Sequence, residues 1–314
     1  MLTYALKRVG LAVIITAISL ILIISMIQFI PGDPAAVLLG PLASPQMRET
    51  FRQQMGLDQP ALVQIARFFG RVLMGDLGTD VLTNRSVLIT VLEQLPFTLA
   101  LIATSIGWSA LLGIPLGCFA AVYRGSFSDR IVGVLSVSSI ALPAFVVAVY
   151  SLLLFSVKLG WFPAIGAGDR GAPLDQLYHL VLPSLAVGLG WVGYLARMVR
   201  ASMLEVLSES HIRMARAFGL EERTIIYQYA LKIAIIPTVV ILGIGVGNMI
   251  SSAVFAEIVF ARPGVGKLIF DAIATRNYPV VMGAVMITTG FYVLSTLIAD
   301  LIAAGLDPRV RSAL

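Results

Sequence analysis

The sequence predicts an all-α integral membrane protein with six transmembrane helices. Of its 314 residues, 58% are hydrophobic and only 12% are charged, and the mean hydropathy is +0.94. An ordinary globular domain is far more polar than this. The apolar residues also gather into six windows, each long enough to cross the hydrocarbon core as a helix of about twenty residues.

The six windows give the expected spans in chain order, at residues 9–30, 97–122, 131–157, 180–196, 235–256 and 281–299. The first window is longer than the apolar core of a secretory signal, and no small-x-small cleavage site follows it before the string PGDP. We therefore expect it to remain as a helix. Pro115 and Pro143 fall inside the second and third spans, where each is expected to bend its helix.

The distribution of Lys and Arg predicts the orientation, because short cytoplasmic loops retain positive charge. One side has twelve such residues and the other has five: Lys7, Arg8, Arg124, Arg130, Arg197, Arg200, Arg213, Arg216, Arg223, Lys232, Arg309 and Arg311 against Lys158, Arg170, Arg262, Lys267 and Arg276. Both termini are therefore expected in the cytoplasm. The net charge of +5 reflects this orientation rather than a nucleic-acid-binding patch, because the basic residues are divided between both sides.

The loop between the first two spans is much longer than a connector requires, and its pattern is helical. Ser44 and Pro45 begin one short helix, and Asp58 with Pro60 opens another. We expect an N-terminal transmembrane helix (1–30), a helical extracytoplasmic subdomain (31–95), a core transmembrane domain (96–303) and a cytoplasmic tail (304–314).

Two strings imitate nucleotide-binding motifs. The glycines of GLGWVG at 188–193 fit a dinucleotide fingerprint, but they lie inside an apolar span, where close helix packing explains them better. The string PGVGK at 263–267 resembles the end of a P-loop, yet Leu268 replaces the hydroxyl residue that reaches magnesium. The chain is therefore expected to have no catalytic residue and no cofactor of its own.

The spans also lack the buried charges on which ion-driven carriers depend. Cys118 is the single cysteine, and the two histidines are too isolated for a metal site. The driving energy is therefore expected to come from outside this polypeptide. Uncharged side chains must contact any cargo, and we select Asn248, Ser251 and Ser252 as pore-lining residues, although many serines in such helices only bond their own backbone.

A basic stretch, HIRMARAFGLEERTIIYQYALKIAIIP at residues 211–237, interrupts the apolar sequence. Ser208 is expected to cap a helix that runs to Phe218, and Gly219 to end it in the left-handed conformation. Glu221 and Glu222 favour the start of a second helix. The unit would present Ile212, Ala215 and Phe218 on or near one face to a partner's groove, with Arg213 and Arg216 beside them. An ordinary basic loop is the alternative.

This stretch resembles the cytoplasmic EAA-type loop of ABC importer permeases, in the dipeptide, oligopeptide, glutathione and nickel branch. Further strings resemble signatures of the same family in the expected order: PGDP, GLDQP, GDLG, RASMLEVLSE, AEIVFARPGVGKL, NYPVVMG and LDPRVR. The chain is most similar to the first permease of such systems, the dipeptide-permease B type. Phe218 departs from the Lys that is commoner at its position.

The resemblance implies the type I importer fold and one half of a heterodimeric pore in a bacterial inner membrane. The partners would be a second permease, an extracytoplasmic solute-binding protein and two ATPases that bind ATP and magnesium. The implied ATPase-coupling residues are Ile212, Arg213, Ala215, Arg216, Ala217, Phe218, Gly219 and Glu221, and Asp33, Asp76 and Gly78 are the expected contacts with the binding protein. The expected cargo is a short peptide; a nickel chelate or another small solute is the alternative, and a secondary carrier is a distant one.

Overall fold

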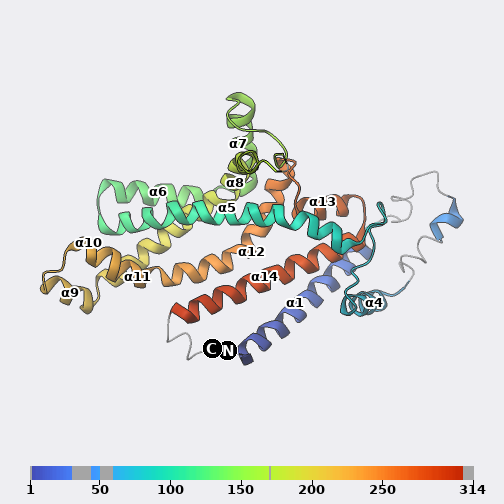
Figure 1. The fold of residues 1–314 in the computed structure, drawn as a ribbon, viewed down its shortest axis with the longest axis horizontal. Coiled ribbons are helices and arrows are strands. Elements are labelled where there is room, and N and C mark those ends of the chain that lie inside the picture. Colours follow the sequence, from blue (N-terminus) through green and yellow to red (C-terminus); the bar gives the residue numbers. More distant parts are fainter. Residues whose placement is uncertain (1, 30–43, 50–58, 170, 307–314) are drawn as a thin grey trace. The chain divides into compact units, whose positions relative to one another are not determined.

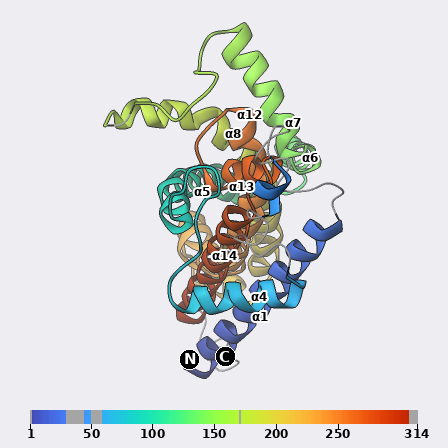
Figure 2. The ribbon, with the colours of Figure 1, turned by 90° about the vertical axis from the view of Figure 1, so that its right-hand side faces the viewer.

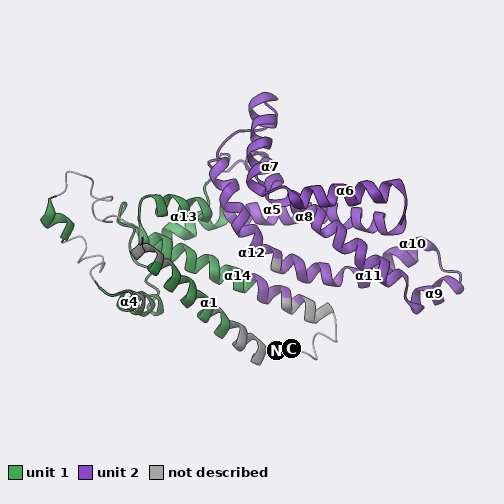
Figure 3. Cartoon of the chain, turned by 180° about the vertical axis from the view of Figure 1, so that it is seen from behind, with its two compact units in different colours: residues 1–97, 263–294 green, residues 98–262, 295–314 purple. Residues whose placement is uncertain are grey.

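The computed structural model describes residues 2–29, 44–49, 59–169 and 171–306, which form helices joined by turns (Figure 1). Within these residues, β pairing is limited to one isolated antiparallel bridge between Thr79 and Ser86. The chain divides into two compact units, residues 1–97 with 263–294 and residues 98–262 with 295–314 (Figure 3). Two long helices, α5 (Val87–Val122) and α14 (Tyr278–Leu306), contribute to both units.

The first unit contains α1 (Leu2–Phe29), α4 (Ala61–Leu73), the start of α5, α13 (Val265–Ala274) and most of α14. Helix α4 crosses α1 (Figure 2). The core of the unit includes Leu20, Phe68, Val87 and Val265. Ser44 begins a short helix, as expected, because its hydroxyl accepts the Met47 N–H at 3.2 Å. Helix α4 follows in the same loop, so the helical character expected of the loop after α1 is confirmed for its described residues.

The second unit contains the rest of α5, followed by α6 (Phe127–Ala141), α7 (Ala144–Ser151), the π-helix η1 (Leu152–Lys158) and α8 (Pro173–Leu207). The basic stretch forms α9 (Ser210–Ala217), α10 (Glu222–Thr224), the π-helix η2 (Ile225–Ala230) and α11 (Leu231–Ala234), and α12 (Ile236–Val259) follows. The predicted bend at Pro143 is confirmed, because α6 and the α7–η1 segment meet at 96°. At Pro115, α5 continues as a single helix.

Small residues allow α8 to pack closely against both α5 and α6. A Cβ atom on Gly117 of α5 would overlap the Ala196 carbonyl of α8, and one on Gly193 of α8 would overlap Ser136 and Ser139 of α6. The GLGWVG string therefore serves helix packing, as its position in an apolar span indicated. Helices α5, α6 and α8 form a close-packed block in this unit.

Three helices among the described residues are long and apolar enough to cross a membrane: α5, α8 and Tyr278–Ala299 of α14. Two bent pairs, Phe127–Ala141 with Ala144–Lys158 and Glu222–Ala234 with Ile236–Gly243, raise this number to five. A shorter apolar stretch, Val9–Leu22, belongs to α1. Each of the six predicted windows thus coincides with an apolar helix or a bent helix pair.

Candidate coupling site and central cavity

The helical unit of the basic stretch, residues 208–224, begins differently from the prediction. Ser208 does not cap α9; it ends α8, where its backbone N–H and its hydroxyl both donate to the Glu205 carbonyl, at 3.1 and 2.7 Å. Glu209 precedes the first residue of α9 and has extended backbone angles. Local sequence favoured serine as a cap, but α8 continues to Leu207 through its tertiary contacts and leaves Ser208 at a helix C-terminus.

Helix α9 rests its apolar face on its own chain. Ile212 is fully buried and Ala215 is buried with it, in a core that includes Val199, Met203 and Ile225. In this structure Ile212 and Ala215 attach α9 to its own chain, and their contact with a partner stays a prediction. A helix of eight residues is too short to be stable alone, so it needs its apolar stripe to attach to α8 and η2.

The opposite face of α9 is open to solvent. Met214 is 58% exposed and Phe218 is 78% exposed, and Arg213, Ala217 and Glu221 are exposed with them. Solvent-exposed aromatic and thioether side chains next to arginines are typical of a surface that another protein covers. Of the three predicted anchors, Phe218 alone has the exposure that a partner contact requires.

Gly219 ends α9 as predicted, with a φ of +75°. Its N–H donates to the Arg216 carbonyl at 2.9 Å, and the Leu220 N–H donates to the Ala215 carbonyl at 3.2 Å. This pair of bonds is the Schellman arrangement, which requires the left-handed conformation that glycine adopts without strain. Glu221 then precedes α10, and Arg216 forms an ion pair with Glu222 at 2.7 Å that spans the turn.

Asn248 and Ser252 border a cavity of about 440 Å³ in the second unit. Trp191 and Tyr194 of α8 line it as well, with their rings 5.5 Å apart, and no charged side chain is among its lining residues. Ser251 is not among them, and the Ser252 hydroxyl donates to the Asn248 carbonyl of its own helix at 3.3 Å. Sequence reasoning missed Trp191 and Tyr194, whose spacing of three residues places them on one helix face.

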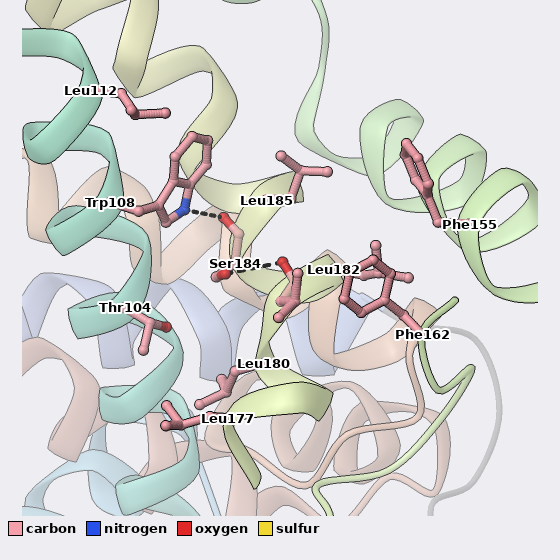
Figure 4. A pocket seen from close by; sticks show the side chains of 11 residues that line it. Thr104, Trp108, Leu112, Phe155, Phe162, Leu177, Leu180, Leu182, Ser184 and Leu185 are labelled. Atoms are coloured by element: carbon pink, nitrogen blue, oxygen red, sulfur yellow. Dashed lines mark hydrogen bonds between the residues drawn. The ribbon is translucent and has the colours of Figure 1, made fainter. Parts of the chain in front are cut away.

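A second cavity, of about 650 Å³, lies between α5, α8 and η1 and is almost entirely apolar (Figure 4). Its polar groups are engaged within the protein: the Trp108 indole N–H donates to the Ser184 carbonyl at 3.1 Å, and the Thr104 hydroxyl donates to the Ala100 carbonyl at 2.8 Å. Phe155 lies across the cavity from Trp108 (Figure 4). This cavity therefore offers few polar groups to orient a hydrophilic solute.

The residues predicted to contact a binding protein have different positions. Asp33 lies outside the described residues. Asp76 is exposed, and its carboxylate accepts the Gly78 N–H at 2.8 Å. Gly78 is buried, with a φ of +90°, so the glycine is needed for the turn itself, and its contact with a binding protein stays a prediction.

An unpredicted polar cluster holds the loop after α4. Asp80 accepts bonds from the Thr83 hydroxyl at 2.6 Å, from the Leu82 N–H at 2.8 Å and from the Asn277 amide. Burial opposes ionisation of Asp80, but the bonds from Thr83, Leu82 and Asn277 together lower the pKa of this carboxyl below its ordinary value. The cluster joins residues 197 positions apart, and neighbouring sequence carries no signal of it.

The P-loop-like string leads into an ordinary helix, because Pro263 and Gly264 precede α13 and Val265 begins it. Lys267 forms an ion pair with Asp271 one turn further along α13, at 2.5 Å. Within the described part of the chain, no group of three His, Cys, Asp or Glu side chains is arranged to hold a metal ion. The Lys267 ammonium is therefore paired with a carboxylate on its own helix, as is common for oppositely charged surface residues four positions apart.

Comparisons with known proteins agree along nearly the whole chain. A model for the binding-protein-dependent transport system inner membrane component matches residues 113–312, and a model for the N-terminal part of such components matches residues 1–102. The glutathione transport system permease protein GsiC of Salmonella paratyphi A is 36% identical over 99% of both chains. Its counterpart in Escherichia coli strain K12 is 35% identical, also over 99% of both chains.

A solved structure shares the fold. A chain of the MetNI methionine ABC transporter, in an inward-facing conformation, aligns with a TM-score of 0.58 and 19% identity over 70% of this chain and 97% of that chain. A second crystal form of the same transporter gives a TM-score of 0.56.

Proposed function

Since the chain belongs to the family of binding-protein-dependent transport system inner membrane components, the permease subunits of ABC importers, we propose that it imports glutathione or short peptides. The observation that carries this proposal is the 36% identity to a glutathione transport permease over 99% of both chains. The chain has the type I importer fold, and we assign ATP hydrolysis to its partners.

The cavity beside Asn248 suits a peptide cargo. Its volume of about 440 Å³ falls within the range of roughly 300–1,000 Å³ that is typical of small-molecule sites. A peptide backbone presents uncharged donors and acceptors, which the Asn248 amide can match, while Trp191 and Tyr194 supply apolar contact. In a heterodimer, the second permease would complete the path from the other side.

The exposed face of α9 is the proposed contact with an ATPase. Arg213, Ala217, Phe218 and Glu221 are accessible there, whereas Ile212 and Ala215 attach the helix to its own chain. ATP binding would close the two ATPases, and the displaced α9 would turn the cavity from one membrane face to the other. In this arrangement both termini and the 208–224 unit face the cytoplasm. Asp76 lies on the opposite side of the membrane and faces the binding protein.

Reconstitution of this chain with its second permease, both ATPases and the binding protein tests the proposal. We expect glutathione or a dipeptide to stimulate ATP hydrolysis and to accumulate inside vesicles that present the binding-protein side outward. Stimulation by a nickel chelate or a sugar, with none by glutathione or any peptide, would overturn the substrate class. Cargo leaving the vesicles would overturn the direction.

A variant of the cavity sharpens the test. Asn248→Leu removes the amide at similar size and should raise the KM for uptake by about tenfold, which corresponds to the loss of a hydrogen bond or two. Thr288→Val is the matched control, because the Thr288 hydroxyl donates to the Ala284 carbonyl of its own helix at 2.9 Å. Equal KM values in the wild type and in Asn248→Leu would remove Asn248 from the proposed cargo path.

A further inference from the structure

A two-contact ion pair ties the α5–α6 turn to the cytoplasmic end of α8. Arg200 Nε donates to Asp129 Oδ1 at 2.6 Å, and Arg200 Nη2 donates to Oδ2 at 2.8 Å. The Asp129 side chain is 8% exposed and the Arg200 side chain 32% exposed. A planar guanidinium that meets a carboxylate through two parallel bonds fixes orientation as well as distance.

The carboxylate is held in place independently of the arginine. The Gly125 N–H donates to Asp129 Oδ2 at 2.9 Å, and the Asp129 N–H donates to the Ser126 hydroxyl at 3.2 Å. Ser126 caps α6, and Gly125 has a φ of +82°. The turn thus presents a preorganised acceptor to α8.

The pair closes the end of the block formed by α5, α6 and α8. Gly117 brings α5, and Gly193 brings α6, into close contact with α8. Arg200 lies two turns before the end of α8 at Leu207. Only Ser208 and Glu209 then separate α8 from α9. A displacement of α9 therefore reaches the end of α8, two turns from the ion pair.

We propose that Asp129 and Arg200 are positioning residues, which make the α5–α6 turn, α8 and the 208–224 unit move as one body when the partner ATPases act. The inference rests on the proposed role of α9 and extends it. With the pair intact, movement of α9 is transmitted to three packed helices. Without it, α8 can be displaced while the α5–α6 turn stays behind, and ATP is hydrolysed with less transport.

Four variants of the reconstituted complex test the proposal through the ratio of uptake to ATP hydrolysed. Arg200→Met and Asp129→Asn should each lower this ratio by about fivefold, the lower end of common allosteric couplings, while complex yield stays within twofold. The double variant should be no worse than either single one, because both remove the same contact. Arg197→Met, an exposed arginine one turn earlier on α8, is the matched control and should keep the wild-type ratio.

A second measurement does not depend on the cargo. Spin labels at the exposed positions Phe127 and Glu205, in a background with Cys118→Ala, report the distance between α6 and α8. We expect one narrow distance distribution with and without ATP in the otherwise unchanged complex, and a broader or ATP-dependent one in Arg200→Met.

The outcomes separate this inference from the proposed function. If the wild-type complex imports neither glutathione nor peptides, the substrate assignment fails, and the distance distributions still decide the role of the pair. Narrow, ATP-independent distances in Arg200→Met would assign the pair to folding alone and overturn the inference. So would uptake and ATP hydrolysis that fall by the same factor in Arg200→Met and Asp129→Asn.

Discussion

At the residue scale, the backbone conformation of Gly219 allows the turn between α9 and α10 to form. The φ of +75° lies where a side chain with a Cβ is strained, although no neighbouring atom would meet that Cβ within 4 Å. The glycine is therefore needed for conformation and not for space. Sequence reasoning reached this residue because a lone glycine after an amphipathic segment is a frequent helix terminator.

Gly219→Val is expected to destabilise the turn by at least about 1 kcal/mol. The variant should retain less ATPase on purification and should transport less. Gly133→Val is its control, because a Cβ at Gly133 would also meet no neighbouring atom within 4 Å, while the φ of this residue is not positive. Normal ATPase retention and normal transport in Gly219→Val would contradict the required conformation.

Asp80 gives the first unit a dependence on pH. Because its pKa in the folded protein is lowered, the stabilisation is complete above the ordinary pKa of the carboxyl and is lost as the pH falls through the lowered folded value. The thermal unfolding midpoint in detergent should therefore drop on acidification below about pH 4, near the ordinary pKa of an aspartate.

Asp80→Asn should lower the midpoint at neutral pH and flatten this acid dependence. Glu93→Gln is the control, since the Arg85–Glu93 pair has side chains that are 52% and 48% exposed and such a surface pair stabilises little. If the unfolding midpoint of Asp80→Asn falls with pH as it does in the wild type, the loss of stability in acid would come from other carboxylates.

At the element scale, α9 separates residues that attach the helix to its own chain from residues that are exposed to solvent. The sequence predicted a helix, its terminator at Gly219 and the second start near Glu221 correctly. It did not predict which face points inward, because in only eight residues an apolar stripe looks the same whether the chain or a partner covers it. The start of α9 was also predicted at the wrong residue. The end of α8 depends on its tertiary packing, which the sequence around Ser208 does not indicate.

Opposite outcomes are expected for the two faces of α9. Ile212→Ala removes a fully buried side chain and should lower the free energy of unfolding by about 2–5 kcal/mol. Phe218→Ala changes an exposed side chain and should leave the unfolding midpoint unchanged, but should weaken ATPase binding by about 2 kcal/mol if Phe218 is an interface anchor. Thermal unfolding measures the stability of each variant, and quantitative co-purification measures how much ATPase each variant binds. Undiminished ATPase binding in Phe218→Ala would place the docking surface elsewhere.

At the scale of the whole molecule, apolar windows predicted where the membrane helices lie, and hydropathy alone was sufficient for that. The contacts between them were not predictable, because Asp129 and Arg200 are 71 residues apart and Asp80 and Asn277 are 197 apart. Ser126, three residues before Asp129, is a helix-capping signal in the sequence, but it does not indicate that Asp129 pairs with Arg200. The sequence predicted a bend at Pro143, but it did not predict that the bend would be close to a right angle.

Topology is a prediction for the complete chain. Single cysteines at Ser44 and Ser210, in a background without Cys118, should react with a membrane-impermeant maleimide from opposite sides of intact cells or inverted vesicles. The reason is the excess of Lys and Arg in one set of short loops. A pair of labels reached from the same side would contradict the six-span orientation, and a label at Ser208 should agree with the one at Ser210.

The cavity beside Asn248 gives the protein an optical reporter of its own. Of the three tryptophans in the chain, Trp191 lines this cavity, Trp108 is hydrogen-bonded to Ser184, and Trp161 is 57% exposed. Indole emission shifts to shorter wavelength when water leaves the ring, so Trp108→Phe with Trp161→Phe would isolate one emitter beside the proposed cargo path. Cargo arrival and release could then be timed in the assembled transporter by fluorescence, without an attached dye.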